Sequence, residues 1–112
     1  MKKTLLLSLI FSLLFLTNSC NKVDYVQIDE DIIQQYISDN NLSAEPTGSG
    51  LYYVIDVPGT GDNPTLNSNV TVAYTGSLTN GTIFDQSSAS GISFPLSGVI
   101  QGWQEGIPLF KE

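Results

Sequence analysis

The spacing of hydrophobic residues changes twice along this chain and divides it into three stretches. A largely apolar run, interrupted only by Ser8 and Ser12, fills residues 5–16, shortly after two lysines. In residues 29–41 the apolar side chains recur at helical spacing, whereas from residue 51 onward they alternate with polar ones as in a strand. The pattern predicts a leader, then a short helix, then a β-rich domain.

The predicted short helix has the sequence DEDIIQQYISDNN, and its apolar stripe consists of Ile32, Ile33, Tyr36 and Ile37. Carboxylates at residues 29–31 suit the positive end of the helix dipole, and Asn40 and Asn41 are suitable stops. A short helix with a narrow stripe is not stable alone. We therefore expect it either to dock on the domain that follows or to pair with a second copy of itself. Residues 43–50, SAEPTGSG, have the composition of a linker.

Several short strands are predicted after the linker. The segment LYYVIDV is aromatic and β-branched, and it ends at the turn cluster PGTGDNP. In VTVAYTGSL the side chains alternate, and Asn80-Gly81 then favours a tight hairpin with positive φ into the strand IFD. The segment ISFPL predicts one more strand, with Pro95 indicating an edge or a bulge. The face predicted for VTVAYTGSL consists of Val70, Val72, Tyr74 and Leu78.

One helix is predicted near the end of the chain, in VIQGWQEGIPLF. Gly102 and Gly106 weaken it and Pro108 ends it. The predicted fold class is therefore α+β: an antiparallel twisted sheet wrapped on one short helix, preceded by a signal peptide and a short N-terminal helix.

The first twenty residues are predicted to be an export signal. Twelve residues in a helix rise only about 18 Å, less than the roughly 30 Å hydrocarbon core, so a spanning helix is the poorer interpretation. A basic start, a short apolar run and the small Ser19 are typical of a signal peptide. Cys20 follows, and the whole resembles a bacterial lipoprotein signal, which implies lipidation of Cys20. An ordinary buried thiol is the alternative for this cysteine.

Composition and charge exclude several classes of function. The chain has no histidine and a single cysteine, which excludes histidine or multi-cysteine metal sites and Ser-His or Cys-His catalysis. It has four lysines and no arginine against eleven carboxylates, so we expect no nucleic-acid binding. After cleavage before Cys20, two lysines would face all eleven carboxylates. Attachment to a membrane would then depend on acyl chains and not on a basic patch.

Two segments of the chain, VTVAYTGSLTNGTIFDQS and FPLSGVIQGWQEGI, resemble the FKBP-type peptidyl-prolyl cis-trans isomerases. The shared pattern is a Y-T-G strand, a glycine turn, an F-D pair and V-I-x-G-W-x-E-G. The resemblance covers about residues 51–111. It implies an isomerase of Xaa-Pro bonds in exported proteins, with proline-containing polypeptides as substrates and with no cofactor or metal.

The resemblance also implies a role for each residue of a pocket. Trp103 would be the floor under the proline ring, with Tyr74 and Phe84 as walls and Asp85 close to the Tyr74 hydroxyl. Val99 and Ile100 would form the lip, where the Ile100 N–H would hold a substrate carbonyl. Taken singly, the aromatic and branched residues are also explained as plain core, and Asp85 as a turn residue. The remaining residues expected to bind substrate are Ile92 and Phe94.

This chain departs from the family pattern in three places. Ile92 stands where an aromatic is often found, and the loop DQSSASGIS lacks the arginine that some members place beside the aspartate. Family domains continue for some tens of residues beyond the helix, whereas this chain ends at Glu112. We therefore expect an N-terminal fragment, mostly unfolded as an isolated chain and with Trp103 exposed to solvent.

The expected organisation is a lipoprotein signal peptide at 1–19, a helical extension and linker at 20–50, and a partial isomerase domain at 51–112. The protein is expected in the bacterial cell envelope, lipid-anchored and facing the periplasm or the cell exterior. A non-catalytic proline-binding or chaperone-like lipoprotein is the alternative function, and an inactive fragment is a third.

Overall fold

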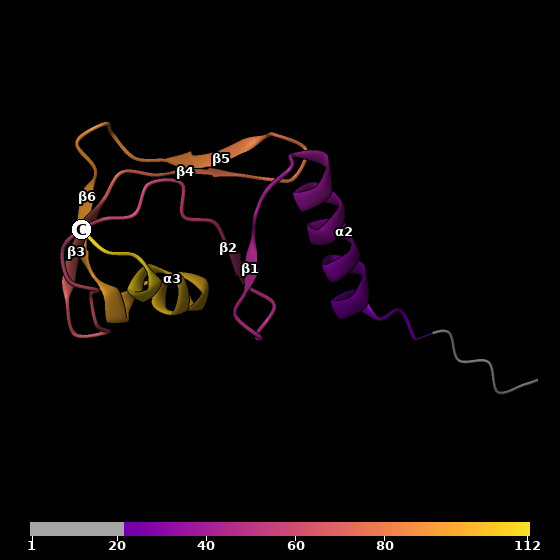
Figure 1. The fold of residues 1–112 in the computed structure, drawn as a ribbon, viewed down its shortest axis with the longest axis horizontal. Coiled ribbons are helices and arrows are strands. Elements are labelled where there is room, and N and C mark those ends of the chain that lie inside the picture. The colour runs from indigo at the N-terminus through magenta and orange to yellow at the C-terminus, as the bar shows by residue number, and fades with distance from the viewer. Residues whose placement is uncertain (1–21) are drawn as a thin grey trace, which may run out of the picture.

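A computed structural model describes residues 22–112 of the chain. The predicted signal peptide and Cys20 lie outside the described residues. The elements follow one another from a long helix, α2, through a small strand pair to a β-rich part that carries the second helix, α3 (Figure 1). Short helices and antiparallel strand pairs confirm the α+β class.

The helix α2, Tyr25–Asp39, begins four residues earlier than the apolar stripe predicted. Its N-cap is Asp24, whose carboxylate accepts a 3.3 Å hydrogen bond from the Gln27 N–H, so the acidic residues 29–31 lie within the helix and not at its start. Asn40 is the C-cap and Asn41 has φ 50°, which confirms the predicted stop. The start was missed because the helix was taken to begin at the acidic run, whereas Asp24 is the N-cap and Ile28, four residues before Ile32, extends the apolar stripe.

A pair of two-residue strands follows α2: β1, Glu45–Pro46, falls in the predicted linker, and β2, Tyr52–Tyr53, covers only two residues of the strand predicted in LYYVIDV. Strand β1 pairs antiparallel with β2. The Tyr52 hydroxyl donates a 2.5 Å hydrogen bond to Glu30 of α2 and accepts one of 2.8 Å from Gln34. These bonds join the helix to the segment behind it, while Ile32 and Tyr36 of its apolar stripe stay exposed.

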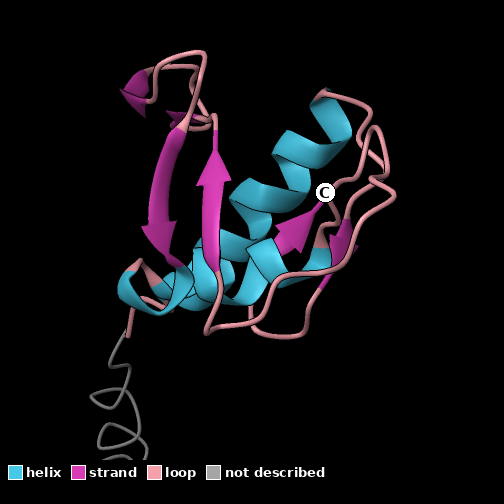
Figure 2. Cartoon of the chain, turned by 90° about the vertical axis from the view of Figure 1, so that its left-hand side faces the viewer, coloured by secondary structure: helices cyan, strands magenta, loops and turns pink. Residues whose placement is uncertain are grey.

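The remaining strands form two separate pairs and not one continuous sheet. Strand β3, Asn69–Val72, pairs with β6, Ile92–Pro95, while β4, Thr75–Ser77, pairs with β5, Ile83–Gln86. The predicted strand from residue 70 to residue 78 is thus split at Ala73 and Tyr74. Figure 2 shows the strands as separate short arrows joined by loops. Burial still alternates across the break, so Val70, Val72 and Tyr74 share the half-buried face as predicted, whereas Leu78 is exposed.

The predicted hairpin at Asn80-Gly81 is present between β4 and β5. Gly81 has φ 91°, and the Leu78 N–H donates a 2.8 Å hydrogen bond to the Thr82 carbonyl across the turn. The register then shifts, since Gly76 faces Asp85 while the next residue, Ser77, faces Ile83. Phe84 is left without a partner residue, which defines a β-bulge at this position.

The helix α3, Gln101–Gly106, lies between two 3₁₀ turns, η2 at Leu96–Gly98 and η3 at Ile107–Leu109. Pro108 lies in η3, so the α-helix ends before this proline as predicted. Among residues 22–112 only Leu96 is fully buried, with none of its surface exposed. This leucine was predicted only as the end of a strand, and its place in the core was not foreseen.

The end of the chain returns to the start of the β-rich part. The Glu112 carbonyl accepts hydrogen bonds of 2.7 and 2.8 Å from the Thr60 and Gly61 N–H groups. Gly59 is needed here because a Cβ at this position would clash with the Glu112 backbone. Within residues 22–112, every helix is too short or too polar to traverse a bilayer.

Candidate functional site

Three aromatic rings from three different elements meet beside α3. The Trp103 ring lies 4.8 Å from the Tyr74 ring in an edge-to-face arrangement at 83°, and 5.3 Å from the Phe94 ring at 32°. These centroid distances are those of favourable aromatic pairs. Tyr74 follows β3, Phe94 belongs to β6 and Trp103 to α3, so the β3–β6 pairing brings the three together.

Trp103 is half-buried in this cluster. The backbone N–H of Trp103 donates a 3.0 Å hydrogen bond to the Ile100 carbonyl, and this bond stabilises the first turn of α3. In the folded chain, Tyr74 and Phe94 pack against the indole and shield part of it from solvent. The expectation of an exposed Trp103 was made for an unfolded isolated chain, and it stays a prediction.

Asp85 contacts the aromatic cluster through the Tyr74 hydroxyl. Tyr74 Oη donates a 2.6 Å hydrogen bond to Asp85 Oδ2, which was expected from the sequence resemblance. The bond to Asp85 raises the pKa of Tyr74, with smaller contributions in the same direction from desolvation and from the negative charge of Asp85. The Tyr74 hydroxyl therefore stays protonated, and it remains a donor, well into the alkaline range.

Ser87 holds the Tyr74 backbone in the gap between β3 and β4. Ser87 Oγ accepts a 2.9 Å hydrogen bond from the Tyr74 N–H, and the Ser87 N–H donates a 3.0 Å bond to the Tyr74 carbonyl. This two-way pairing was not predicted, because a serine in a polar loop carries no sequence signal of its own. The same segment lines a shallow hollow of about 260 Å³ next to Tyr74.

The bulge at Phe84 turns its side chain across the neighbouring strand. A Cβ on Gly76 would lie 2.7 Å from Phe84 Cζ, so the ring covers this glycine and requires its lack of a side chain. Phe84 nevertheless stays 67% exposed. It is not packed against Trp103 in any aromatic pair of the described residues, so the structure leaves it at the rim of the aromatic cluster.

Val99 and Ile100 form the segment that enters α3. The Val99 side chain is half-buried and that of Ile100 is 71% exposed. Gln104, which was not singled out from the sequence, fixes this segment: its Nε2 donates bonds of 2.7 Å to the Val99 carbonyl and 3.3 Å to the Ser97 carbonyl. The Ile100 N–H has no hydrogen-bond acceptor within residues 22–112.

Ile92 pairs with Val72 across β3 and β6, and its side chain is 43% exposed. The structure therefore brings Tyr74, Asp85, Phe94 and Trp103 into direct contact. Three of the expected site residues lie on exposed surface and outside the aromatic cluster of Tyr74, Phe94 and Trp103: Ile92, Phe84 and Ile100.

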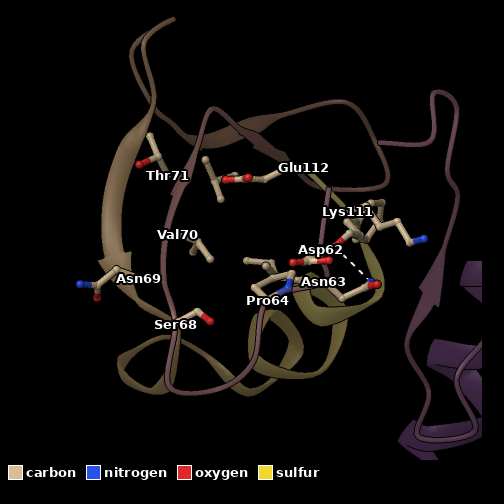
Figure 3. A pocket seen from close by; sticks show the side chains of 12 residues that line it. Asp62, Asn63, Pro64, Ser68, Asn69, Val70, Thr71, Lys111 and Glu112 are labelled. Carbon is tan, nitrogen blue, oxygen red and sulfur yellow. Dashed lines mark hydrogen bonds between the residues drawn. The ribbon is translucent and has the colours of Figure 1, made fainter. Parts of the chain in front are cut away.

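A larger groove, of about 450 Å³, lies away from the aromatic cluster, and Figure 3 shows its lining side chains. One wall is β3 with Val70, and the other is the end of the chain with Lys111 and Glu112. Asn63 Nδ2 donates a 2.8 Å bond to the Pro108 carbonyl at its edge. Neither Trp103 nor Asp85 lines this groove, so it is separate from the candidate site despite its larger volume.

The aromatic cluster offers apolar surface and one protonated hydroxyl, and its single carboxylate is engaged by that hydroxyl. Such a site suits the binding of a small apolar ring, and a conformational change in a bound peptide that breaks no covalent bond.

Comparison with known proteins supports a family assignment for this part of the chain. Residues 61–112 match the family of FKBP-type peptidyl-prolyl cis-trans isomerases. The chain is 53% identical over 68 residues to a probable FKBP-type peptidyl-prolyl cis-trans isomerase FkpA of Neisseria meningitidis serogroup B, a match that covers 59% of this chain and 25% of that protein.

Two further relatives carry a different name. The peptidyl-prolyl cis-trans isomerase Mip of Coxiella burnetii is 45% identical over 74 residues, covering 64% of this chain and 32% of that protein. The outer membrane protein MIP of Legionella longbeachae is 46% identical over 63 residues, covering 54% of this chain and 27% of that protein. The chain thus spans about a quarter to a third of the length of these relatives.

The fold and site define a small α+β domain with a cluster of three aromatic rings beside a tyrosine–carboxylate hydrogen bond. The matches then place residues 61–112 of this chain in the FKBP-type peptidyl-prolyl cis-trans isomerase family, which confirms the resemblance seen in the sequence.

Proposed function

We propose that this chain carries the substrate site of a peptidyl-prolyl cis-trans isomerase, acting on Xaa-Pro bonds of exported polypeptides without a covalent intermediate. The observation that carries the proposal is the Tyr74–Asp85 hydrogen bond of 2.6 Å beside the rings of Trp103 and Phe94. The family of residues 61–112 supports the same reaction.

The reaction needs an apolar surface more than it needs a reactive group. Rotation about a peptide bond faces a barrier of about 18–20 kcal/mol, caused by amide resonance. Because the twisted amide is less polar than the planar one, a site of low polarity binds it better than the ground state. The aromatic cluster provides such a surface.

Each residue of the site has a proposed role. Trp103 supports the proline ring, with Phe94 and Tyr74 beside it. Ile92, Phe84 and Val99 would contact the residues that flank the proline, which agrees with the positions of Ile92 and Phe84 on exposed surface. The Ile100 N–H, which lacks an acceptor within residues 22–112, would bind the carbonyl of the substrate.

Asp85 has two effects on the proposed site. It keeps the Tyr74 hydroxyl aligned and protonated, and it places a negative charge near the amide that is to twist. The loop that follows Asp85, residues 86–93, contains neither arginine nor lysine, so this loop supplies no cation to the carboxylate.

We also propose that the protein is exported and held in the cell envelope by lipid on Cys20. Support comes from the basic and apolar start of the chain and from the name of the Legionella longbeachae relative as an outer membrane protein. The proposed divisions are a signal peptide at 1–19, an extension at 20–50 and the isomerase segment at 51–112.

A non-catalytic proline-binding module is the second candidate. The observation that favours it is the exposed position of Phe84 and Ile100, which leaves the site open on one side and accessible to solvent. An open surface binds a proline segment but excludes water poorly from the amide.

The two candidates are distinguished by the isomerisation rate of an Xaa-Pro peptide. For the isomerase, the full chain accelerates the reaction, and Asp85→Leu and Phe84→Tyr both slow it while the fold is kept. For the binding module, the peptide binds and quenches or shifts Trp103 emission, but the rate equals that of the uncatalysed reaction. A rate unchanged by Asp85→Leu would remove that residue from its role.

A further inference from the structure

The turn between β1 and β2 is built to present one side chain. The Thr47 N–H donates a 2.9 Å hydrogen bond to the Leu51 carbonyl, and Thr47 Oγ1 donates a second of 3.2 Å to the same oxygen. Gly48 and Gly50 have φ of 93° and 98°, a conformation that residues with a Cβ rarely adopt. Ser49 stands between these two glycines, at the tip.

Ser49 reaches across 56 residues of sequence to the helix that carries Trp103. Its Oγ donates a 2.5 Å hydrogen bond to Glu105 Oε1, and Thr47 Oγ1 lies 3.0 Å from the same serine oxygen. The hydrogen bonds of Ser49, and then of Thr47, lower the pKa of Glu105 and outweigh the opposing effect of desolvation.

The same turn also packs against the end of α3. A Cβ at Gly106 would lie 3.3 Å from Leu51 Cδ2, which places the leucine methyl group directly over the helix backbone. The turn thus makes a polar contact to Glu105, through Ser49, and an apolar contact to the next residue, Gly106, through Leu51.

The helix α3 depends on outside support. It has six residues, two of them glycines, and an isolated helix of that length does not form in water. Trp103 and Glu105 are two residues apart, roughly 200° around the helix, so they point to nearly opposite sides. The aromatic cluster therefore supports one side of α3 and the turn supports the other.

We propose that residues 47–51 form a clamp on α3, in which Ser49 and Glu105 are positioning residues that hold Trp103 in the aromatic cluster. This inference deepens the proposed function, because it assigns the orientation of the proposed proline-ring support to a segment outside the family match of residues 61–112. Neither Ser49 nor Glu105 touches the reacting peptide; both act through the helix.

The clamp also joins the site to the N-terminal helix. Tyr52 lies one residue beyond Leu51, and its hydroxyl bonds to Glu30 and Gln34 of α2. The hairpin is therefore bonded to α3 at its tip, through Ser49, and to α2 through Tyr52 of β2. Figure 1 shows the strands β1 and β2 between these two helices. It follows that the extension contributes to the site and does not act only as a spacer.

The test measures tryptophan fluorescence, which reports on Trp103 alone because this chain has no other tryptophan. The full chain is measured in detergent. Ser49→Ala should raise acrylamide quenching of Trp103 about twofold, the size expected when a single net hydrogen bond supporting a marginal helix is lost. Ser49→Thr keeps the hydroxyl and should restore the quenching of the parent chain. Glu45→Gln is the matched control, since Glu45 bonds to Tyr53 in the same hairpin and not to α3.

Further variants distinguish loss of the clamp from general unfolding of the chain. Gly48→Ala meets no atom within 4 Å, so it disturbs only the turn backbone and should raise quenching as Ser49→Ala does. Glu105→Ala should match Ser49→Ala, and the two combined should add nothing further. Unchanged quenching in Ser49→Ala and Gly48→Ala, or additive effects in the double variant, would overturn the clamp.

Kinetics give an independent readout. If the chain is an isomerase, Ser49→Ala should raise KM for an Xaa-Pro peptide more than it lowers kcat, because the floor is displaced while Asp85 and Tyr74 stay in place. A chain without isomerase activity would contradict the proposed function, yet the quenching results would still decide the clamp.

Discussion

Tyr74 Oη and Asp85 Oδ2 lie 2.6 Å apart, and this hydrogen bond ties the strand pair β4–β5 to the ring that packs edge-on against Trp103. The bond joins Asp85 of β5 to Tyr74 in the gap between β3 and β4, so it fixes the position of the tyrosine ring as well as raising the pKa of its hydroxyl. The carboxylate and the tryptophan, 18 positions apart in sequence, act on one tyrosine.

The first prediction concerns the titration of Tyr74. Ionising its hydroxyl would remove the donor and place a second negative charge beside Asp85, which is why the pKa of Tyr74 is raised. Asp85→Leu should return that pKa toward the ordinary value of about 10. Ultraviolet absorbance of tyrosinate during an alkaline titration measures the change.

The same bond predicts the direction of a pH effect on stability. A group whose pKa is raised on folding contributes stability below its unfolded pKa and loses it as pH rises through the folded value. The difference in unfolding free energy between parent and Asp85→Leu should therefore shrink at alkaline pH. Glu45→Leu should instead alter Tyr53, whose pKa is raised chiefly by its bond to Glu45, and should leave Tyr74 unchanged.

Leu96 is predicted to dominate the stability of the β-rich part. It is the one fully buried side chain among residues 22–112, and truncating a buried leucine commonly costs about 2–5 kcal/mol. Leu96→Ala should strongly lower the urea concentration at the midpoint of unfolding, which is measured by the emission of Trp103. Leu78→Ala is the matched control at a half-exposed position, and equal losses for the two leucines would show that Leu96 is not the core.

A fourth prediction separates the position of the Phe84 ring from the overall stability of the fold. Gly76→Ala would place a methyl group 2.7 Å from Phe84 Cζ, and the exposed ring is free to swing away. We expect a displaced Phe84, seen in the aromatic NMR signals, with a small change in unfolding free energy. Gly102→Ala is the control: it meets no atom within 4 Å and should stabilise α3 by about 1 kcal/mol.

The last prediction tests the proposed anchor. Cys20→Ser should leave the signal uncleaved by the lipoprotein peptidase and release the protein from acyl-mediated membrane attachment, because a hydroxyl is not a substrate for thioether formation. Membrane fractionation and metabolic labelling with a fatty acid measure this. Equal acylation of the parent and of Cys20→Ser would contradict the role of Cys20.

Local elements could be predicted from the sequence because their causes are local. Alternation of apolar and polar residues identified the half-buried face that holds Val70, Val72 and Tyr74. Asn80-Gly81 identified the hairpin, since a glycine accepts the positive φ that the turn requires. The α+β class and the family followed from these elements and from the Y-T-G, F-D and G-W-x-E-G patterns.

What depends on contacts between distant residues was decided only by the tertiary structure. Three features leave no periodic trace in the sequence, because each depends on contacts between segments that are separate in the sequence: the bulge at Phe84, the burial of Leu96 and the pairing of Ser87 with the Tyr74 backbone. The linker is the clearest case. Its composition indicates flexibility, yet two positive-φ glycines and one serine fold it onto α3, because a carboxylate 56 residues away accepts the serine hydroxyl.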